Sequence, residues 1–133
     1  MGNTTIFRYA KWGTSSQNLL MHEYSIVQSL IQSCQEHVEE NSATKVTQLF
    51  IKVGVMSGVE PYLLQEAFET FKRETVCDSC KLHINIQKVK IECLQCNTIS
   101  ELEKNEYLCP KCKSIEINIL DGEDMFLMSL ELE

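Results

Sequence analysis

The chain has 133 residues, 44% of them hydrophobic, and carries a net charge of −7 with a pI of about 5.0. This length favours one domain, or one domain with a small inserted module, and it allows a real core. The acidic balance, without a basic stripe, argues against a nucleic-acid partner. No apolar run resembles a membrane span or a secretory signal, so we expect a cytoplasmic protein without a membrane partner.

The first half of the chain predicts a helix, a strand and a second helix in that order. Apolar residues at helical spacing over 26–38 predict the first helix, and alternating residues over 45–56 predict a strand with one buried face. Glu60 and Pro61 suit the start of the second helix, because proline tolerates the first helical position and a carboxylate is stabilised at the positive end of the helix dipole.

The second half predicts strands around a cysteine-rich segment. Residues 81–92 read as one long strand whose apolar phase changes after Ile86, as expected for a strand that leaves one core and enters another. Residues 115–119 alternate again, and Asp121-Gly122 reads as a hairpin-type turn. The last strand, within 125–132, is expected to place four apolar residues on one face: Phe126, Met128, Leu130 and Leu132.

Together these elements predict an α+β fold, with two helices, a small sheet of about three strands and an inserted zinc-ribbon-like four-cysteine module. We expect residues 1–20 to be a non-native N-terminal extension that precedes Met21. Residues 21–90 and 121–133 are expected to form the α+β domain, and residues 91–120 the metal-binding module.

Six of the seven cysteines fall in three C-x-x-C pairs, each separated from the next by twelve residues. Reduced thiols in this pattern favour metal binding over disulfides. The first two pairs flank the predicted strand, whose ends would lie roughly 40 Å apart, whereas residues 97–108 can fold back. The metal ligands are therefore expected to be Cys93, Cys96, Cys109 and Cys112. Four thiolates with no open position indicate a structural Zn(II).

The remaining cysteines have a simpler interpretation. Cys34 lies on an apolar helix face and is expected to be a small core residue. Cys77 and Cys80 are followed by a strand, whereas a thioredoxin-type pair begins a helix. We therefore favour a loop with two reduced thiols over a redox site, although this pair also offers two thiols to zinc.

The sequence Met21-His22-Glu23 allows either of two interpretations. These residues are the solvated start of a helix, or Met21 is the true first residue of the protein. In the second case the free amine, the next two backbone nitrogens and the His22 imidazole form a nitrogen-rich planar set that suits Ni(II) or Cu(II). The first N–H groups of a helix have no intrahelical partners, so they are free for this use.

Three motifs in order, MHEYSIVQSL, VGVMSGVEPYLLQEAFETF and CLQC…CPKC, closely resemble the HypA/HybF family of hydrogenase maturation proteins. The resemblance runs from Met21 to the C-terminus. It implies a nickel metallochaperone, not an enzyme, with no catalytic residues. It implies Ni(II) bound at Met21, His22 and Glu23, with Glu60 at the position of a proposed further ligand. It also implies Zn(II) at the four later cysteines.

The same resemblance implies the partners: a HypB-like GTPase, the precursor of the [NiFe]-hydrogenase large subunit and, in some organisms, urease maturation proteins. Two other functions remain open on the cysteine pattern alone. One is a zinc ribbon that binds nucleic acid, although Cys93–Lys113 has no excess positive charge. The other is a rubredoxin-like electron-transfer protein, although Asn97 and Lys113 stand where such iron sites usually carry glycine.

Overall fold

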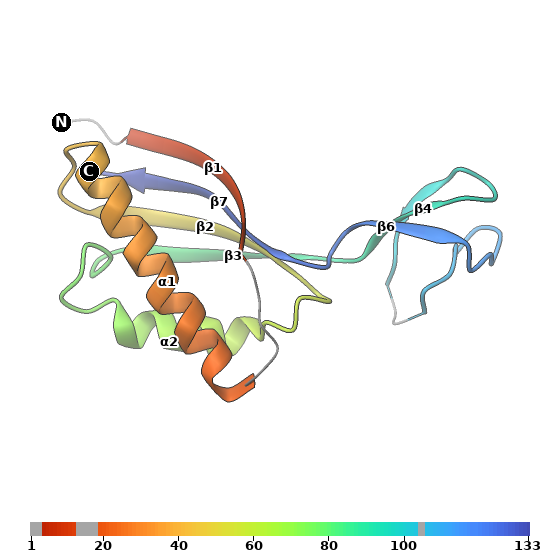
Figure 1. The fold of residues 1–133 in the computed structure, drawn as a ribbon, viewed down its shortest axis with the longest axis horizontal. Helices are drawn as coiled ribbons and strands as arrows, with labels where there is room; N and C mark the ends of the chain where they lie inside the picture. Colours follow the sequence, from red (N-terminus) through yellow and green to blue (C-terminus); the bar gives the residue numbers. More distant parts are fainter. Residues whose placement is uncertain (1–3, 13–18, 104–105) are drawn as a thin grey trace.

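The computed structural model describes residues 4–12, 19–103 and 106–133, and the side chains from residue 23 onward within these ranges. A four-stranded sheet is covered by two helices, and a three-stranded sheet lies beyond one end of it (Figure 1). Each sheet has its own hydrophobic cluster. Among the described residues, no helix is long and apolar enough to cross a membrane.

The larger sheet has the strand order β1-β7-β2-β3. These strands are β1 (Thr4–Trp12), β2 (Val46–Gly54), β3 (Lys81–Gln87) and β7 (Met125–Leu132). The neighbours β2 and β3 run parallel, whereas β7 is antiparallel to both β1 and β2. Strand β2 alternates as expected, with Leu49, Ile51 and Val53 buried, and this alternation directs one face of the sheet towards the helices.

Helices α1 (Leu19–Glu40) and α2 (Pro61–Phe71) cover that face of the sheet and share its hydrophobic cluster (Figure 1). The buried stripe of α1 repeats at helical spacing and includes Cys34, which is 1% exposed. Helix α1 ends after Glu40, where Ser42 adopts a left-handed backbone with φ 52° and the Ala43 N–H bonds back to the Val38 carbonyl.

The smaller sheet has the order β5-β4-β6, with all pairs antiparallel. Its strands are β4 (Lys90–Cys93), β5 (Ile99–Glu101) and β6 (Ile117–Asp121). The buried residues of its cluster are few, and two of them are cysteines: Val89, Ile91, Cys93, Leu102 and Cys109. Because this core is so small, we expect a bound metal to supply much of the free energy of folding of the three-stranded module.

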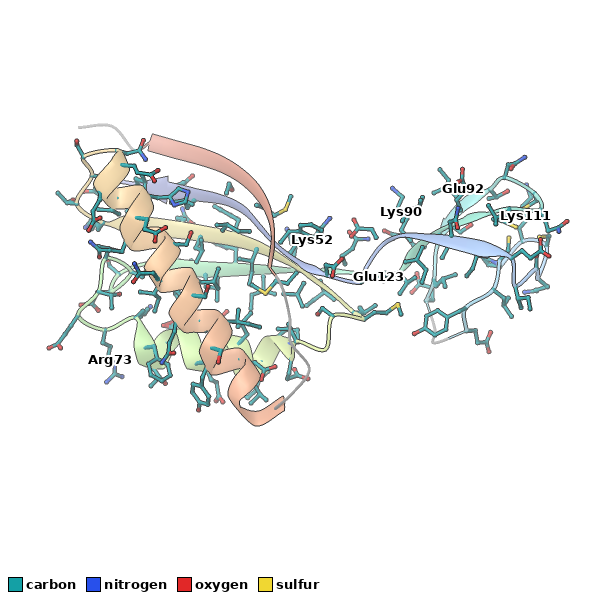
Figure 2. All side chains as sticks on the ribbon, viewed as in Figure 1. Lys52, Arg73, Lys90, Glu92, Lys111 and Glu123 are labelled. Atoms are coloured by element: carbon teal, nitrogen blue, oxygen red, sulfur yellow. The ribbon has the colours of Figure 1, made fainter. Side chains whose placement is uncertain are left out.

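The chain passes between the two sheets at a tight junction. A Cβ atom added to Gly54 would lie 2.3 Å from the Gly122 carbonyl oxygen, and one added to Gly122 would lie 2.7 Å from Val89 Cα, so neither position can carry a side chain. The Gly54 N–H donates to the Asp124 carbonyl at 2.9 Å. Lys52, labelled in Figure 2 near this junction, forms a 2.7 Å ion pair with Asp121 at the end of β6.

The predicted fold class is confirmed: two helices, a small sheet and an inserted four-cysteine module. The larger sheet has four strands, however, because residues 4–12 pair with β7 as β1. The long strand expected over 81–92 is divided into β3 and β4, and each half joins a different cluster, as its phase change predicted. The expected division of the chain into domains stays a prediction.

Two details of the last strands were predicted wrongly. Met125 and Leu127 are buried in place of Phe126 and Met128, because the register with β2 shifts between Phe50 and Ile51. The Asp121-Gly122 segment is not a hairpin, since β6 and β7 belong to different sheets. It leads from one sheet into the other, and Gly122 provides the required φ of 101°.

Candidate metal centres

The structure brings together the four cysteines that the spacing selected. The ligand atoms of Cys93, Cys96, Cys109 and Cys112 all lie within 4.8 Å of one another. The sulfurs of Cys93 and Cys112 are 3.5 Å apart, and those of Cys96 and Cys109 are 3.7 Å apart. A tetrahedral zinc with Zn–S bonds of about 2.3 Å requires sulfur–sulfur distances of about 3.8 Å. The cluster therefore has the dimensions of a four-thiolate metal site.

Each cysteine pair forms the same turn. The Cys96 N–H donates to the Cys93 sulfur at 3.4 Å, and the Cys112 N–H donates to the Cys109 sulfur at 3.4 Å. The Gln95 N–H also donates to the Cys93 sulfur at 3.4 Å. Hydrogen bonds of this kind stabilise the thiolate form, which is the form that binds metal.

The residue after each pair completes the turn. Asn97 and Lys113 adopt left-handed backbones with φ of 59° and 66°. Their N–H groups bond to the carbonyls of Cys93 and Cys109 at 3.0 and 2.9 Å. The backbone therefore has the conformation that glycine favours, although neither residue is glycine. The identity of these two residues consequently does not separate a zinc site from a rubredoxin-like iron site.

Polar neighbours favour the ionised form of two of these thiols. Hydrogen bonds from Thr98, whose Oγ1 lies 3.3 Å from the sulfur, lower the pKa of Cys96 to about 6. The backbone of Cys112 lowers the pKa of Cys109. The lowered pKa of each of these two thiols favours the thiolate, which is the form that binds metal.

The third cysteine pair lies outside this centre. Cys77 and Cys80 are fully buried in the cluster of the larger sheet, together with Cys34. Among the described residues, only the four later cysteines form a group of three or more candidate metal ligands. Geometry therefore groups the four later cysteines and leaves Cys77 and Cys80 apart from them, while the identity of the zinc ligands stays a prediction.

The residues proposed for nickel lie where α1 approaches the start of α2. Met21 and His22 belong to the first turn of α1, and their side chains lie outside the described set. Glu23 follows and is only 4% exposed. Glu60 is exposed and forms the N-cap of α2, with its carboxylate accepting from the Tyr62 N–H at 3.2 Å.

A hydrogen bond joins the two glutamates. Glu23 Oε2 accepts from the Glu60 backbone N–H at 3.0 Å, while Glu23 Oε1 is buried without a hydrogen-bond partner among the described residues. A helix start leaves such N–H groups unpaired, so the Glu23 carboxylate caps α2 from the neighbouring helix. The sequence interpretation missed this role. The sequence did contain a signal for this role, because Glu23 falls within the apolar stripe of α1, where a solvent-exposed residue is not expected.

The family model described as "Hydrogenase/urease nickel incorporation, metallochaperone, hypA" matches residues 21–132 of the chain. The chain belongs to the HypA family. It covers 97% of the hydrogenase maturation factor HypA of Shewanella baltica (strain OS195), which is 52% identical over 113 residues, or 85% of this chain.

Other relatives agree with this assignment. HypA of Aquifex aeolicus is 50% identical over 113 residues, which cover 85% of this chain and 98% of that protein. The solution structure of the Ni metallochaperone HypA from Helicobacter pylori has a TM-score of 0.59 and 38% identity, covering 83% of this chain and 96% of that one. A second solution structure of a HypA protein has a TM-score of 0.64 and 39% identity, over 85% and 97%.

Membership in the HypA family confirms the resemblance on which the sequence interpretation relied. The family consists of nickel-incorporation and maturation factors, not of catalysts. Membership in this family favours a role in nickel incorporation over both the nucleic-acid-binding and the electron-transfer alternatives. Strand β1 lies outside the matched residues, so the fourth strand of the larger sheet belongs to the part of the chain that precedes the family's range.

Proposed function

We propose that this chain is a nickel metallochaperone that binds Ni(II) at the start of α1 and delivers it during maturation of a [NiFe]-hydrogenase. The observation that carries the proposal is the match of residues 21–132 to a nickel-incorporation family, with Met21 as the first residue matched. In a chain that begins at Met21, the ligands we propose are the Met21 amine, the backbone nitrogens of His22 and Glu23, and the His22 imidazole, with Glu60 as a further contributor.

The contacts of Glu23 support this ligand set. Its carboxylate Oε2 accepts from the Glu60 N–H, and the side chain is buried. In a chain that begins at Met21, Glu23 has its backbone nitrogen to offer a metal, while its side chain holds α2 beside the site. The same contact keeps Glu60 next to the first turn of α1, which is where a contributing carboxylate is needed. A planar nitrogen set of this kind suits Ni(II).

We also propose that the four-cysteine cluster holds a structural Zn(II). The sulfur–sulfur distances of 3.5 and 3.7 Å support this, since they are close to those of a zinc tetrahedron. All four ligands come from the chain, so no position remains open for a substrate. The role of this zinc is to fold the module, whose apolar core is small.

The partners we propose are a HypB-like GTPase and the precursor of the hydrogenase large subunit, with urease maturation proteins as a second destination. A transfer experiment tests delivery. The purified protein is loaded with nickel, mixed with the large-subunit precursor with or without the GTPase, and separated again for metal analysis. We expect nickel to move to the precursor and zinc to stay behind. Nickel that remains with this protein under all conditions would contradict delivery.

Loading has its own control in the same experiment. His22→Ala removes the only side-chain nitrogen of the proposed set, so this variant should retain zinc and carry little nickel. A His22→Ala protein that loads nickel as well as the parent chain would move the nickel site away from the start of α1. The transfer result would then describe a different site.

A further inference from the structure

One cysteine pair takes no part in the proposed metal centres. Cys77 and Cys80 are 0% and 1% exposed, and they lie in the segment that follows α2 and leads into β3. Arg73, labelled in Figure 2, marks the beginning of this segment just after the helix. Residues 77–80 therefore place two thiols inside the larger core, away from the module that holds the other pairs.

The backbone brings these two cysteines to the spacing of a disulfide. The Cys80 N–H donates to the Cys77 carbonyl at 2.9 Å, which closes a four-residue turn. The ends of such a turn lie less than about 7 Å apart between Cα atoms, and disulfides span about 4.4–6.8 Å. The turn is held from both sides, because Thr75 Oγ1 accepts from the Cys77 N–H and Lys72 Nζ donates to the Cys80 carbonyl, each at 3.1 Å.

The thiols interact with one another but do not form a third metal site. The hydrogen bond with Cys34 of α1 raises the pKa of Cys77, and the hydrogen bond with Cys77 raises that of Cys80, with burial acting in the same direction for both. Both thiols are therefore protonated at neutral pH. Among the described residues, Cys34, Cys77 and Cys80 do not qualify as a group of three metal ligands.

We propose that Cys77 and Cys80 are a redox pair that closes to a disulfide across the 77–80 turn when the segment between α2 and β3 opens to solvent. The geometry of the turn makes the disulfide possible, and burial withholds the thiols from oxidants in the closed state. A buried thiol is inert until it is exposed and ionised. The rate of oxidation therefore reports local opening beside α2.

The oxidant we name is a small-molecule disulfide such as oxidised glutathione. In the opened segment, one cysteine thiolate attacks a glutathione sulfur, breaks its S–S bond and releases one glutathione thiolate. The second cysteine loses its proton and attacks the protein sulfur of the mixed disulfide, which releases the second glutathione. The protein dithiol loses two electrons and two protons, and glutathione disulfide becomes two thiols. Oxidation also ends the thiol contact between Cys77 and Cys34 of α1.

The experiment compares the folded full-length protein, with metal in its four-cysteine centre, with a free peptide of residues 74–81. Both are incubated with excess oxidised glutathione, free thiols are alkylated, and the protein is digested with trypsin. Cleavage after Arg73 and Lys81 leaves both cysteines in one peptide, separate from Cys34 and from the four cysteines of the module. A disulfide makes this peptide lighter by two hydrogens and prevents its alkylation.

We expect the disulfide to form in the folded protein at least about tenfold more slowly than in the free peptide, because burial and protonation suppress the thiolates. Urea below the unfolding transition should accelerate it. Each of these results overturns the proposal: no disulfide in the folded protein, a stable glutathione adduct on one cysteine, or a rate equal to that of the peptide. Cys34→Ser is the matched control and should still form the disulfide. A Cys34–Cys77 disulfide in the unmodified protein would also overturn it.

This pair is independent of the nickel proposal, since none of its residues belongs to the proposed nickel ligands. The decisive measurement uses the unmodified chain, so a variant that fails to fold leaves the result intact. Cys77→Ser and Cys80→Ser serve only to confirm the assignment, because each must abolish the lighter peptide.

Discussion

At the scale of single residues, Glu23 lies within the buried apolar stripe of α1, where an apolar side chain is expected. A buried carboxylate is costly unless it is hydrogen-bonded. Here Oε2 accepts from the Glu60 N–H, one of the groups that the start of α2 leaves unpaired. The positive end of the helix dipole favours the same charge. Glu23 is therefore tolerated in the core because it completes the start of a neighbouring helix.

This role predicts the effect of removing the side chain. Glu23→Ala leaves the Glu60 N–H without its side-chain acceptor, and we expect it to lower the free energy of unfolding by about 0.5–2 kcal/mol, as loss of a helix cap does. Urea unfolding at neutral pH measures the change. Glu23→Gln retains an acceptor oxygen and should lose less. If the alanine variant is as stable as the parent chain, the hydrogen bond to α2 contributes nothing.

The position of Glu60 allows two roles, as the cap of α2 and as a contributor to nickel binding. Its carboxylate caps α2 through the Tyr62 N–H, so Glu60→Ala should cost about 1 kcal/mol of stability whatever its role with nickel. If Glu60 also contributes to nickel binding, the variant should bind Ni(II) more weakly and retain its zinc. Nickel titration and metal analysis on the same sample distinguish these roles. Lower thermal stability with unchanged nickel affinity would leave Glu60 as a helix cap alone.

At the scale of elements, the two turns of the four-cysteine module depend on a metal more than on packing. Cys93→Ala or Cys109→Ala opens the tetrahedron, so we expect loss of zinc and unfolding of β4–β6. Cys77→Ala should retain one zinc per chain, because Cys77 lies in the other core. Metal analysis of the three variants compares them directly. Loss of zinc from the Cys77 variant alone would overturn the ligand set.

The junction between the sheets predicts a dependence on pH. Burial opposes the ionisation of Asp121, but the hydrogen bonds from Lys52 and the Gly122 N–H outweigh it and lower its pKa. A group whose pKa is lower in the folded state stabilises the protein above its unfolded pKa of about 3.9, and the benefit is lost as pH falls through the folded pKa. Asp121→Asn should therefore be less stable than the parent chain near pH 7 and about equal to it in strong acid.

Thermal unfolding across this pH range provides the measurement, and a second ion pair provides the control. Lys88 and Glu103 form an ion pair at 2.9 Å, and their side chains are 49% and 73% exposed. The side chains of Lys52 and Asp121 are only 16% and 23% exposed. Exposed pairs contribute little, so Glu103→Gln should change stability much less. Equal effects of both substitutions would mean that the junction gains nothing from its partial burial.

Several elements could be predicted because their signals are local. The Glu60-Pro61 start of α2, the alternation of β2 and the spacing of the cysteines each lie within a few residues. The failed prediction for the last strand depended on partners distant in sequence. The burial of Met125 in place of Phe126 follows from a register shift against β2, and the sequence of the last strand does not indicate this shift. Strand β1 did carry a local signal, since TTIFRYAKW is rich in β-branched and aromatic residues.

At the scale of the whole molecule, the residue at which the chain begins determines which nitrogen atoms at the start of α1 are available to bind a metal. Helix α1 begins at Leu19, so His22 is its fourth residue and Glu23 its fifth. In a regular helix the fifth N–H bonds to the first carbonyl, which takes the Glu23 nitrogen away from a metal. In a chain that begins at Met21, both nitrogens fall among the four unpaired N–H groups. The family model also begins its match at residue 21.

We therefore predict that a chain beginning at Met21 binds Ni(II) more tightly than the chain beginning at Met1. The shorter chain has a free amine at residue 21, whereas the longer chain lacks this amine and must unwind helix to free the backbone nitrogens. Loss of even one good ligand should weaken binding by about tenfold or more, which corresponds to about 1.4 kcal/mol. Nickel titration of both chains, with the zinc content held equal, measures the difference.

The pH dependence and one variant make the test specific to the proposed ligands. The His22 imidazole must be neutral to bind, so the affinity of the shorter chain should fall as pH drops below about 6.5. His22→Ala in the shorter chain should remove most of the affinity and this pH dependence together. Equal affinity for the two chain lengths would mean that the amine is not a ligand. Unchanged affinity in the His22 variant would place the nickel site away from α1, because no other side chain in the proposed set supplies a nitrogen.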